Sequence, residues 1–228
     1  MTRPAPSSYP KPPATAPAPG ERARIAEIFA RFETVSDNPR TELNYSSPYT
    51  LVTAVALSAQ ATDVQVNKAT AKLFAVADTP QAMLALGEEG LIALISSIGL
   101  FRTKARNVLA AARLIMEQHD GEVPLNRRDL QALPGVGRKT ASVVLNELGI
   151  EPAIAVDTHV FRVAHRLGLA KGKTPDQVEA ELMAVVPDPA KVRAHHWLIL
   201  HGRYVCLARR AKCEDCVLAD LCPSRGKV

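Results

Sequence analysis

Hydrophobic residues recur along this chain at intervals of three and four positions, and no stretch shows sustained alternation of hydrophobic and polar residues. The first spacing places side chains on one face of an α-helix, whereas alternation is typical of a β-strand. The first stripe consists of Ile25, Ile28, Phe29 and Phe32. Further helices are predicted over residues 48–58 and 63–74, from 80, and over 88–97, 102–118, 126–132, 138–148, 158–167, 175–185 and 189–202. The pattern therefore predicts an all-α fold.

Local signals support the predicted helix ends. Ser47, Thr79 and Thr174 each precede a proline, and this pair is typical of an N-cap followed by the first helical residue. Gln177 lies three residues after Thr174 and can complete a capping box. Gly149 follows the helix predicted over 138–148 and can end it in a left-handed conformation.

Composition separates the start of the chain from the rest. Residues 1–20 contain seven of the 17 prolines and no acidic residue, which predicts a disordered tail. The apolar content of the whole chain is 47%, which is ordinary for a globular protein. No apolar run approaches the ~18 residues that span a membrane, and the first residues lack the apolar core of a signal peptide. We expect a soluble intracellular protein.

The residues from Leu133 to His159 carry most of the candidate chemistry. They open with a turn that contains Gly135 and Gly137, where backbone N–H groups are not covered by side chains. A helix follows directly, and exposed N–H groups at a helix N-terminus can bind an anion such as a phosphate. Lys139 lies on the side of this helix opposite its apolar stripe.

The chain can also bring an aspartate, Asp157, close to Lys139. The helix after Lys139 carries the chain away by roughly 15 Å, and the extended segment over 150–156 can span about 23 Å, which is long enough to bring it back. Asp157 follows this segment and can therefore lie close to Lys139. An uncharged lysine amine is a nucleophile, and a nearby carboxylate can stabilise developing positive charge or help to move protons. Taken separately, Lys139 is also compatible with a solvated helix lysine and Asp157 with a helix N-cap.

The last 38 residues hold a basic excess and all four cysteines. Residues 191–228 contain eight lysines and arginines but three acids, and this excess equals the net charge of +5 for the whole chain. Such a local excess favours a polyanionic partner. The cysteines have the spacing C-x6-C-x2-C-x5-C, and they are Cys206, Cys213, Cys216 and Cys222. The spacing predicts a four-thiolate metal site and is compatible with either structural zinc or a [4Fe–4S] cluster.

These motifs together resemble one family. LPGVGRKTA over 133–141, VDTH over 156–159, HHWLILHGRYVC over 195–206 and the four cysteines are similar to the endonuclease III family, and the resemblance covers residues 23–223. It implies a DNA glycosylase with apurinic/apyrimidinic lyase activity and a helix-hairpin-helix motif. It also implies two helical lobes, a six-helix lobe over 41–151 and an iron–sulfur lobe that combines 21–40 with 152–228. The active site would lie in the cleft between them.

The resemblance also implies a mechanism, a cofactor and partners. Lys139 would attack the sugar C1′ of a damaged nucleotide, an oxidised pyrimidine, and Asp157 would assist. The turn formed by Leu133, Gly135 and Gly137 would hold a DNA phosphate, and the four cysteines would bind a [4Fe–4S] cluster. The partner would be damaged or abasic double-stranded DNA. The chain would act as a monomer in the bacterial cytoplasm, associated with the nucleoid through DNA.

Two further groups of residues are candidates for DNA contact. Arg209, Arg210 and Lys212 lie between the first two cysteines, where a clamped loop can hold phosphates or can simply be solvated. The family resemblance implies that Gln60 and Leu100 enter the DNA stack when a base leaves it. Without the resemblance, a helix-junction amide and a buried leucine are the simpler interpretations.

Two other functions are compatible with parts of the sequence. An adenine glycosylase of the same fold, acting opposite oxidised guanine, would lack a lysine at the position of Lys139 and usually has a further C-terminal domain. A non-catalytic helix-hairpin-helix DNA-binding module would need neither Lys139 nor Asp157.

Overall fold

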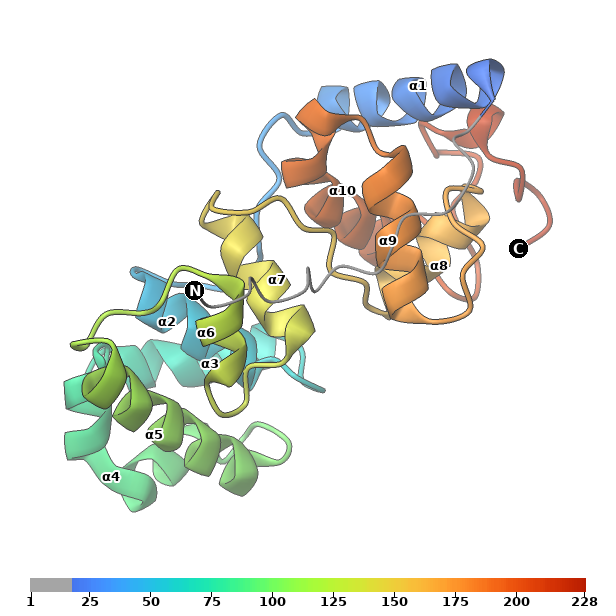
Figure 1. The fold of residues 1–228 in the computed structure, drawn as a ribbon. Coiled ribbons are helices and arrows are strands. Elements are labelled where there is room, and N and C mark those ends of the chain that lie inside the picture. Colours follow the sequence, from blue (N-terminus) through green and yellow to red (C-terminus); the bar gives the residue numbers. More distant parts are fainter. Residues whose placement is uncertain (1–17) are drawn as a thin grey trace, which may run out of the picture. The chain divides into compact units, whose positions relative to one another are not determined.

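A computed structural model describes residues 18–228, and this part of the chain is helical with no β-strand. The predicted all-α fold is confirmed. Figure 1 shows the order of the helices along the chain. Their bounds are α1 Pro19–Val35, α2 Pro48–Leu57, α3 Asp63–Phe74, α4 Pro80–Ile95, α5 Phe101–Gln118, α6 Arg127–Ala132, α7 Arg138–Glu147, α8 Thr158–Arg166, α9 Pro175–Val185 and α10 Lys191–Tyr204, with short 3₁₀ helices η1 Asp188–Ala190 and η2 Ala219–Leu221.

The chain divides into two compact units. Thr41–Pro152 forms one unit and contains α2 to α7; we call it the central unit. The chain up to Arg40 and the segment Ala153–Val228 form the other, which we call the terminal unit. The terminal unit therefore joins α1 to α8, α9 and α10 across more than a hundred intervening residues.

The first helix begins slightly earlier than predicted. It includes Pro19 and Gly20, which the composition had placed in the disordered tail. Proline is compatible with the first turn of a helix because its φ is already near the helical value and its missing N–H has no helical partner there. The rest of the predicted tail lies outside the described residues.

Side-chain caps are present at the start of several helices, at the positions predicted from the sequence. Ser47, Thr62, Thr79 and Thr174 each accept a hydrogen bond from the backbone N–H three residues later. The two helices predicted after Thr79 are both present within α4, and they are separated at Gly87, whose φ of 70° and ψ of 176° are not helical. Glycine adopts this conformation without the steric cost of a Cβ.

The core of the central unit is built around α2. Every residue from Tyr49 to Val55, and also Leu57, is buried, so this helix is covered on all sides. It packs against α3, α5 and α7. The helix that carries Lys139 is therefore fixed by the centre of this unit.

The core of the terminal unit joins α1 to α10. Phe29, Phe32 and Trp197 pack together, and Trp197 donates a hydrogen bond from Nε1 to the carbonyl of Ser36 at 2.8 Å. His195 and His196 are buried next to the tryptophan. This burial gives the two histidines a packing role in the core.

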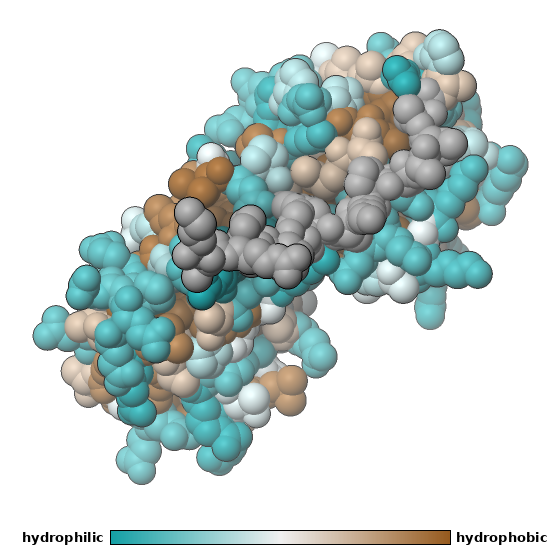
Figure 2. Space-filling model, in the orientation of Figure 1, coloured by the Kyte–Doolittle hydropathy of each residue, from teal (hydrophilic) through white to brown (hydrophobic). Residues whose placement is uncertain are grey.

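Hydrophilic residues cover much of the visible surface of the two units, as Figure 2 shows. Across residues 18–228, no helix is both long enough and apolar enough to cross a membrane.

Candidate functional site

The turn before α7 has the conformation that its glycines permit. Gly135 has φ +80°, and a Cβ built on it would lie 3.0 Å from Cβ of Asn107 on α5. Leu133 and Val136 are buried on either side, and the N–H of Val136 donates to the carbonyl of Leu133 at 3.0 Å. Gly137 is the N-cap of α7 and supplies no side-chain cap. The first N–H groups of α7 therefore lack the side-chain acceptor that usually satisfies them.

The two glycines allow a test of this turn. Gly135→Ala should destabilise the protein by about 1–2 kcal/mol, because its φ is left-handed and Asn107 is close. Gly137→Ala should change stability by less than about 0.5 kcal/mol, since its φ is −83° and nothing lies within 4 Å of the added Cβ. If the turn binds a phosphate as the sequence predicts, both should weaken binding to an abasic duplex, because the glycine backbone could no longer approach the phosphate as closely. Thermal unfolding and DNA titration measure the two effects. Binding by Gly137→Ala at wild-type affinity would rule out a phosphate at this turn.

Lys139 lies in the first turn of α7, in the central unit. The opposite face of this helix is the predicted core stripe, with Ala141, Val144 and Leu145 fully buried. Lys139 itself is exposed, as the helical periodicity requires. The residue is thus exposed at the same helix end as the glycine turn.

Asp157 is the N-cap of α8, in the terminal unit. Its Oδ1 accepts the N–H groups of His159 and Val160 at 2.9 and 2.8 Å. The carboxyl group is partly buried at the end of a buried segment, 153–156. The capping interpretation is therefore correct. It is compatible with chemistry, because the cap holds the carboxylate at one position at the positive end of a helix.

Gln60 and Leu100 occupy two neighbouring turns of the central unit. Both have left-handed backbones, with φ 55° and 59°, and both are exposed. A Cβ built on Gly99 would lie 3.8 Å from the carbonyl oxygen of Gln60. Leu100 is 62% exposed, so its interpretation as a buried leucine is wrong. A large apolar side chain and an amide thus project from adjacent turns.

A buried lysine lies one helical turn beyond Leu100 and was not singled out from the sequence. Lys104 is 7% exposed, and its Nζ has no hydrogen-bond partner among the described residues. Burial lowers the pKa of this amine. The periodicity of α5 gives a weak signal for this burial, because position 104 shares a face with Val108 and Ala111, which are buried.

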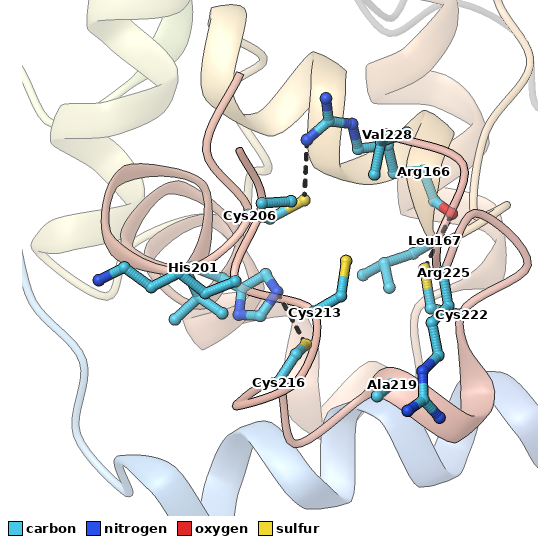
Figure 3. A pocket seen from close by; sticks show the side chains of 13 residues that line it. Arg166, Leu167, His201, Cys206, Cys213, Cys216, Ala219, Cys222, Arg225 and Val228 are labelled. Carbon is cyan, nitrogen blue, oxygen red and sulfur yellow. Dashed lines mark hydrogen bonds between the residues drawn. The ribbon is translucent and has the colours of Figure 1, made fainter. Parts of the chain in front are cut away.

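The four cysteines of the terminal unit line one cavity. Figure 3 shows their sulfur atoms around a common space. Its empty volume is about 360 Å³, part of it open to solvent. His201 Nε2 lies 3.7 Å from Sγ of Cys216, and burial lowers the pKa of His201 to about 4. The Arg166 guanidinium donates to Sγ of Cys206 at 3.4 Å.

The four thiol groups around one cavity form a donor set that fits a metal group bound by thiolates, either zinc or an iron–sulfur cluster. Burial, followed by the charges of the other three cysteines, raises the pKa of Cys216. Thiolates at this site therefore require a positively charged group that offsets their repulsion.

The segment between the first two cysteines forms a short closed loop. The N–H of Lys212 donates to the carbonyl of Val205 at 3.0 Å, and Arg166 donates to the carbonyls of Leu207 and Ala208 at 2.7 and 3.0 Å. Arg209, Arg210 and Lys212 are exposed. The backbone is thus fixed while the basic side chains face solvent.

Comparisons with known proteins agree with this arrangement. Residues 53–188 match the model of the HhH-GPD superfamily of base excision DNA repair proteins. Endonuclease III of Escherichia coli (strain K12) is 56% identical over 207 residues, which cover 91% of this chain and 98% of that protein. Endonuclease III of Haemophilus influenzae is 55% identical with the same coverage of both chains.

Solved structures are also similar. A trapped covalent intermediate of endonuclease III with DNA, in an estranged-adenine complex, matches with a TM-score of 0.84 and 40% identity, covering 90% of this chain and 97% of that one. A thermostable thymine-DNA glycosylase shares the fold, with a TM-score of 0.76 at 24% identity over 92% of this chain and 98% of that one. On the extent of these matches, the chain belongs to the endonuclease III family of the HhH-GPD superfamily.

Proposed function

We propose that this chain removes oxidised pyrimidines from duplex DNA and then cuts the strand through a Schiff base on Lys139. The coarser activity follows from its family, and the chain is a base excision repair DNA glycosylase with lyase activity. The observation that best supports the finer proposal is an exposed lysine in the first turn of a helix whose N-terminus lacks a side-chain cap. We further propose that it acts in the bacterial cytoplasm, on the DNA of the nucleoid.

The first step places the damaged nucleotide. The turn formed by Leu133, Gly135 and Gly137 would bind a phosphate through its N–H groups and the positive end of α7. The base would leave the stack, because its glycosidic bond cannot be attacked within a duplex. Lys139 would then lie within reach of the sugar C1′.

The second step is covalent. Attack requires the Lys139 amine without its proton, and enclosure by bound DNA would favour that form. A bond forms between Nζ and C1′ while the bond from C1′ to the base breaks. Asp157, from the terminal unit, would stabilise positive charge on the sugar or carry a proton. Its two capping bonds to Oδ1 support this role, since they orient the carboxylate before substrate binds.

The third step cuts the strand. The amine and the opened sugar form a protonated Schiff base, which makes loss of a proton at C2′ easier. The electrons then expel the 3′ phosphate by β-elimination. Hydrolysis of the Schiff base would release Lys139 unchanged.

We propose that Gln60 and Leu100 fill the space that the extruded base leaves. Their adjacent turns, their exposure and their left-handed backbones support this role, because such strain often occurs at functional loops. Arg209, Arg210 and Lys212 would contact phosphates elsewhere on the duplex.

Leu100→Ala should slow cleavage of paired damaged DNA by about tenfold, because no large side chain would then fill the space left by the extruded base. Cleavage of an abasic site in a single strand should change little, since no base pair has to open. Thermal unfolding should also change little, because Leu100 is 62% exposed. Equal losses on both substrates would show that Leu100 does not act as a wedge.

We propose that Cys206, Cys213, Cys216 and Cys222 bind a [4Fe–4S] cluster. The common cavity supports this proposal. When bound, the cluster would hold in place a chain end with little regular structure, which follows α10 and contains only η2. The cysteines and their neighbours would thereby also fix the basic loop.

The proposed function is tested with three duplexes. One bears thymine glycol, one an abasic site and one adenine opposite oxidised guanine. The first two should be nicked and the third left intact. Removal of adenine would indicate the adenine glycosylase alternative, and binding without nicking would indicate a non-catalytic DNA-binding module.

A further inference from the structure

Two arginines of α1 contact the backbone beside Cys216 and Cys222, which lie almost two hundred residues later in the sequence. Figure 1 shows α1 in blue beside the red C-terminal segment, within the terminal unit. Arg31 donates to the carbonyl of Val217, the residue after Cys216, at 2.9 Å. Arg24 donates to the carbonyl of Leu221, the residue before Cys222, at 2.9 Å. Each arginine thus holds the backbone next to one cysteine.

The two guanidinium groups are themselves oriented by acids of the same helix. Glu21 accepts two hydrogen bonds from Arg24, at 3.0 and 2.6 Å, and Glu27 accepts one from Arg31 at 2.8 Å. Spacings of three and four residues place each acid beside its arginine. Arg24 and Arg31 are seven residues apart, so they lie on one face of α1, two turns from each other.

The remaining donors strengthen the contact. Arg24 also donates to the carbonyl of Leu167 at the end of α8, and Arg31 forms a bidentate pair with Asp220 at 2.5 and 2.9 Å. Leu218 is fully buried in the same core as Ile25 and Ile28 of α1. The segment with Cys216 and Cys222 is therefore held on α1 by packing and by charged donors.

We propose that α1 is a clip that positions Cys216 and Cys222 to receive and retain the metal cluster, with Arg24 and Arg31 as its positioning residues. This inference rests on the proposed cluster and goes beyond it. The clip consists of contacts between α1 and the backbone beside the two cysteines, and it would act together with the cluster to hold this segment. Arg24 makes the larger contribution, because its side chain is 20% exposed and its loss leaves two carbonyls without their donor.

The test follows release of iron from the full-length holoprotein. After a chelator is added, the visible absorbance of the cluster and the far-ultraviolet helical signal are recorded together. Arg24→Gln should lose the cluster about tenfold faster than the wild type while the helical signal is retained. Arg24→Lys should lie between them, because an ammonium keeps the charge but not the planar fork. Arg31→Gln should also accelerate the loss of the cluster. If Arg24→Gln does not fold, Arg31→Gln alone tests whether α1 positions the two cysteines.

Two matched variants separate the clip from general effects. Asp220→Asn removes an exposed ion pair but keeps the bond from Arg31 to Val217, so it should accelerate the loss of the cluster less than Arg31→Gln does. Arg128→Gln removes a cation with a 90% exposed side chain in the central unit and should have no effect. Wild-type rates in both Arg24→Gln and Arg31→Gln, or cluster loss only together with unfolding, would overturn the clip. A wild-type protein that contains no iron would instead overturn the cofactor proposal.

Discussion

Replacement of Lys139 by glutamine should abolish covalent trapping of the protein on damaged DNA by borohydride. Glutamine has a similar length but no nucleophilic amine, so no Schiff base can form and be reduced. Strand cleavage should fall by at least about 10³-fold, the scale on which removal of a nucleophile acts. Trapped complexes are counted as a slow band on a denaturing gel.

The stability of the variant should be close to that of the wild type, because Lys139 is exposed and the buried face of α7 is unchanged. Lys68→Gln is the matched control, since Lys68 is an exposed lysine of α3 in the same unit. It should trap normally. Full trapping of the Lys139 variant would assign the nucleophile to another amine.

Asp157→Asn should lower the rate of base removal by about 10²–10⁴-fold, the range typical of a lost acid–base or charge-stabilising group. Asparagine caps a helix about as well as aspartate, so α8 should still begin at Thr158. This substitution therefore separates the charge of the carboxylate from its structural role. Single-turnover cleavage of a thymine glycol duplex gives the rate, and thermal unfolding gives the stability.

Asp157→Ala provides the comparison. It should show the same catalytic loss and, in addition, about 1 kcal/mol of lost stability, because the N–H groups of His159 and Val160 lose their acceptor. If Asp157→Asn kept activity within about threefold of the wild type, Asp157 would be a helix cap alone and the proposed chemistry would have to be revised.

The local settings of Asp157 and Lys139 could be anticipated from the sequence, whereas that of Leu100 could not. The cap on α8 was expected, since an aspartate preceded a helical stripe, and the bonds to Oδ1 confirm it. Exposure of Lys139 was expected from periodicity in the same way. The interpretation of Leu100 as a buried residue was wrong, because a turn between two helices leaves its side chain outside both stripes. Leu100 also has a left-handed backbone, with φ 59°, at the N-cap of α5.

The sequence by itself determined the helices, their caps and the glycine turn, because these depend on interactions between residues at most four positions apart. It also determined the grouping of the cysteines, which lie within 17 residues of one another. Only the tertiary structure decided that Lys104 is buried, that the turns of Gln60 and Leu100 adjoin, and that Arg24 meets Leu221. Such contacts join residues far apart along the chain, and their formation depends on how complete helices pack, which no local pattern encodes.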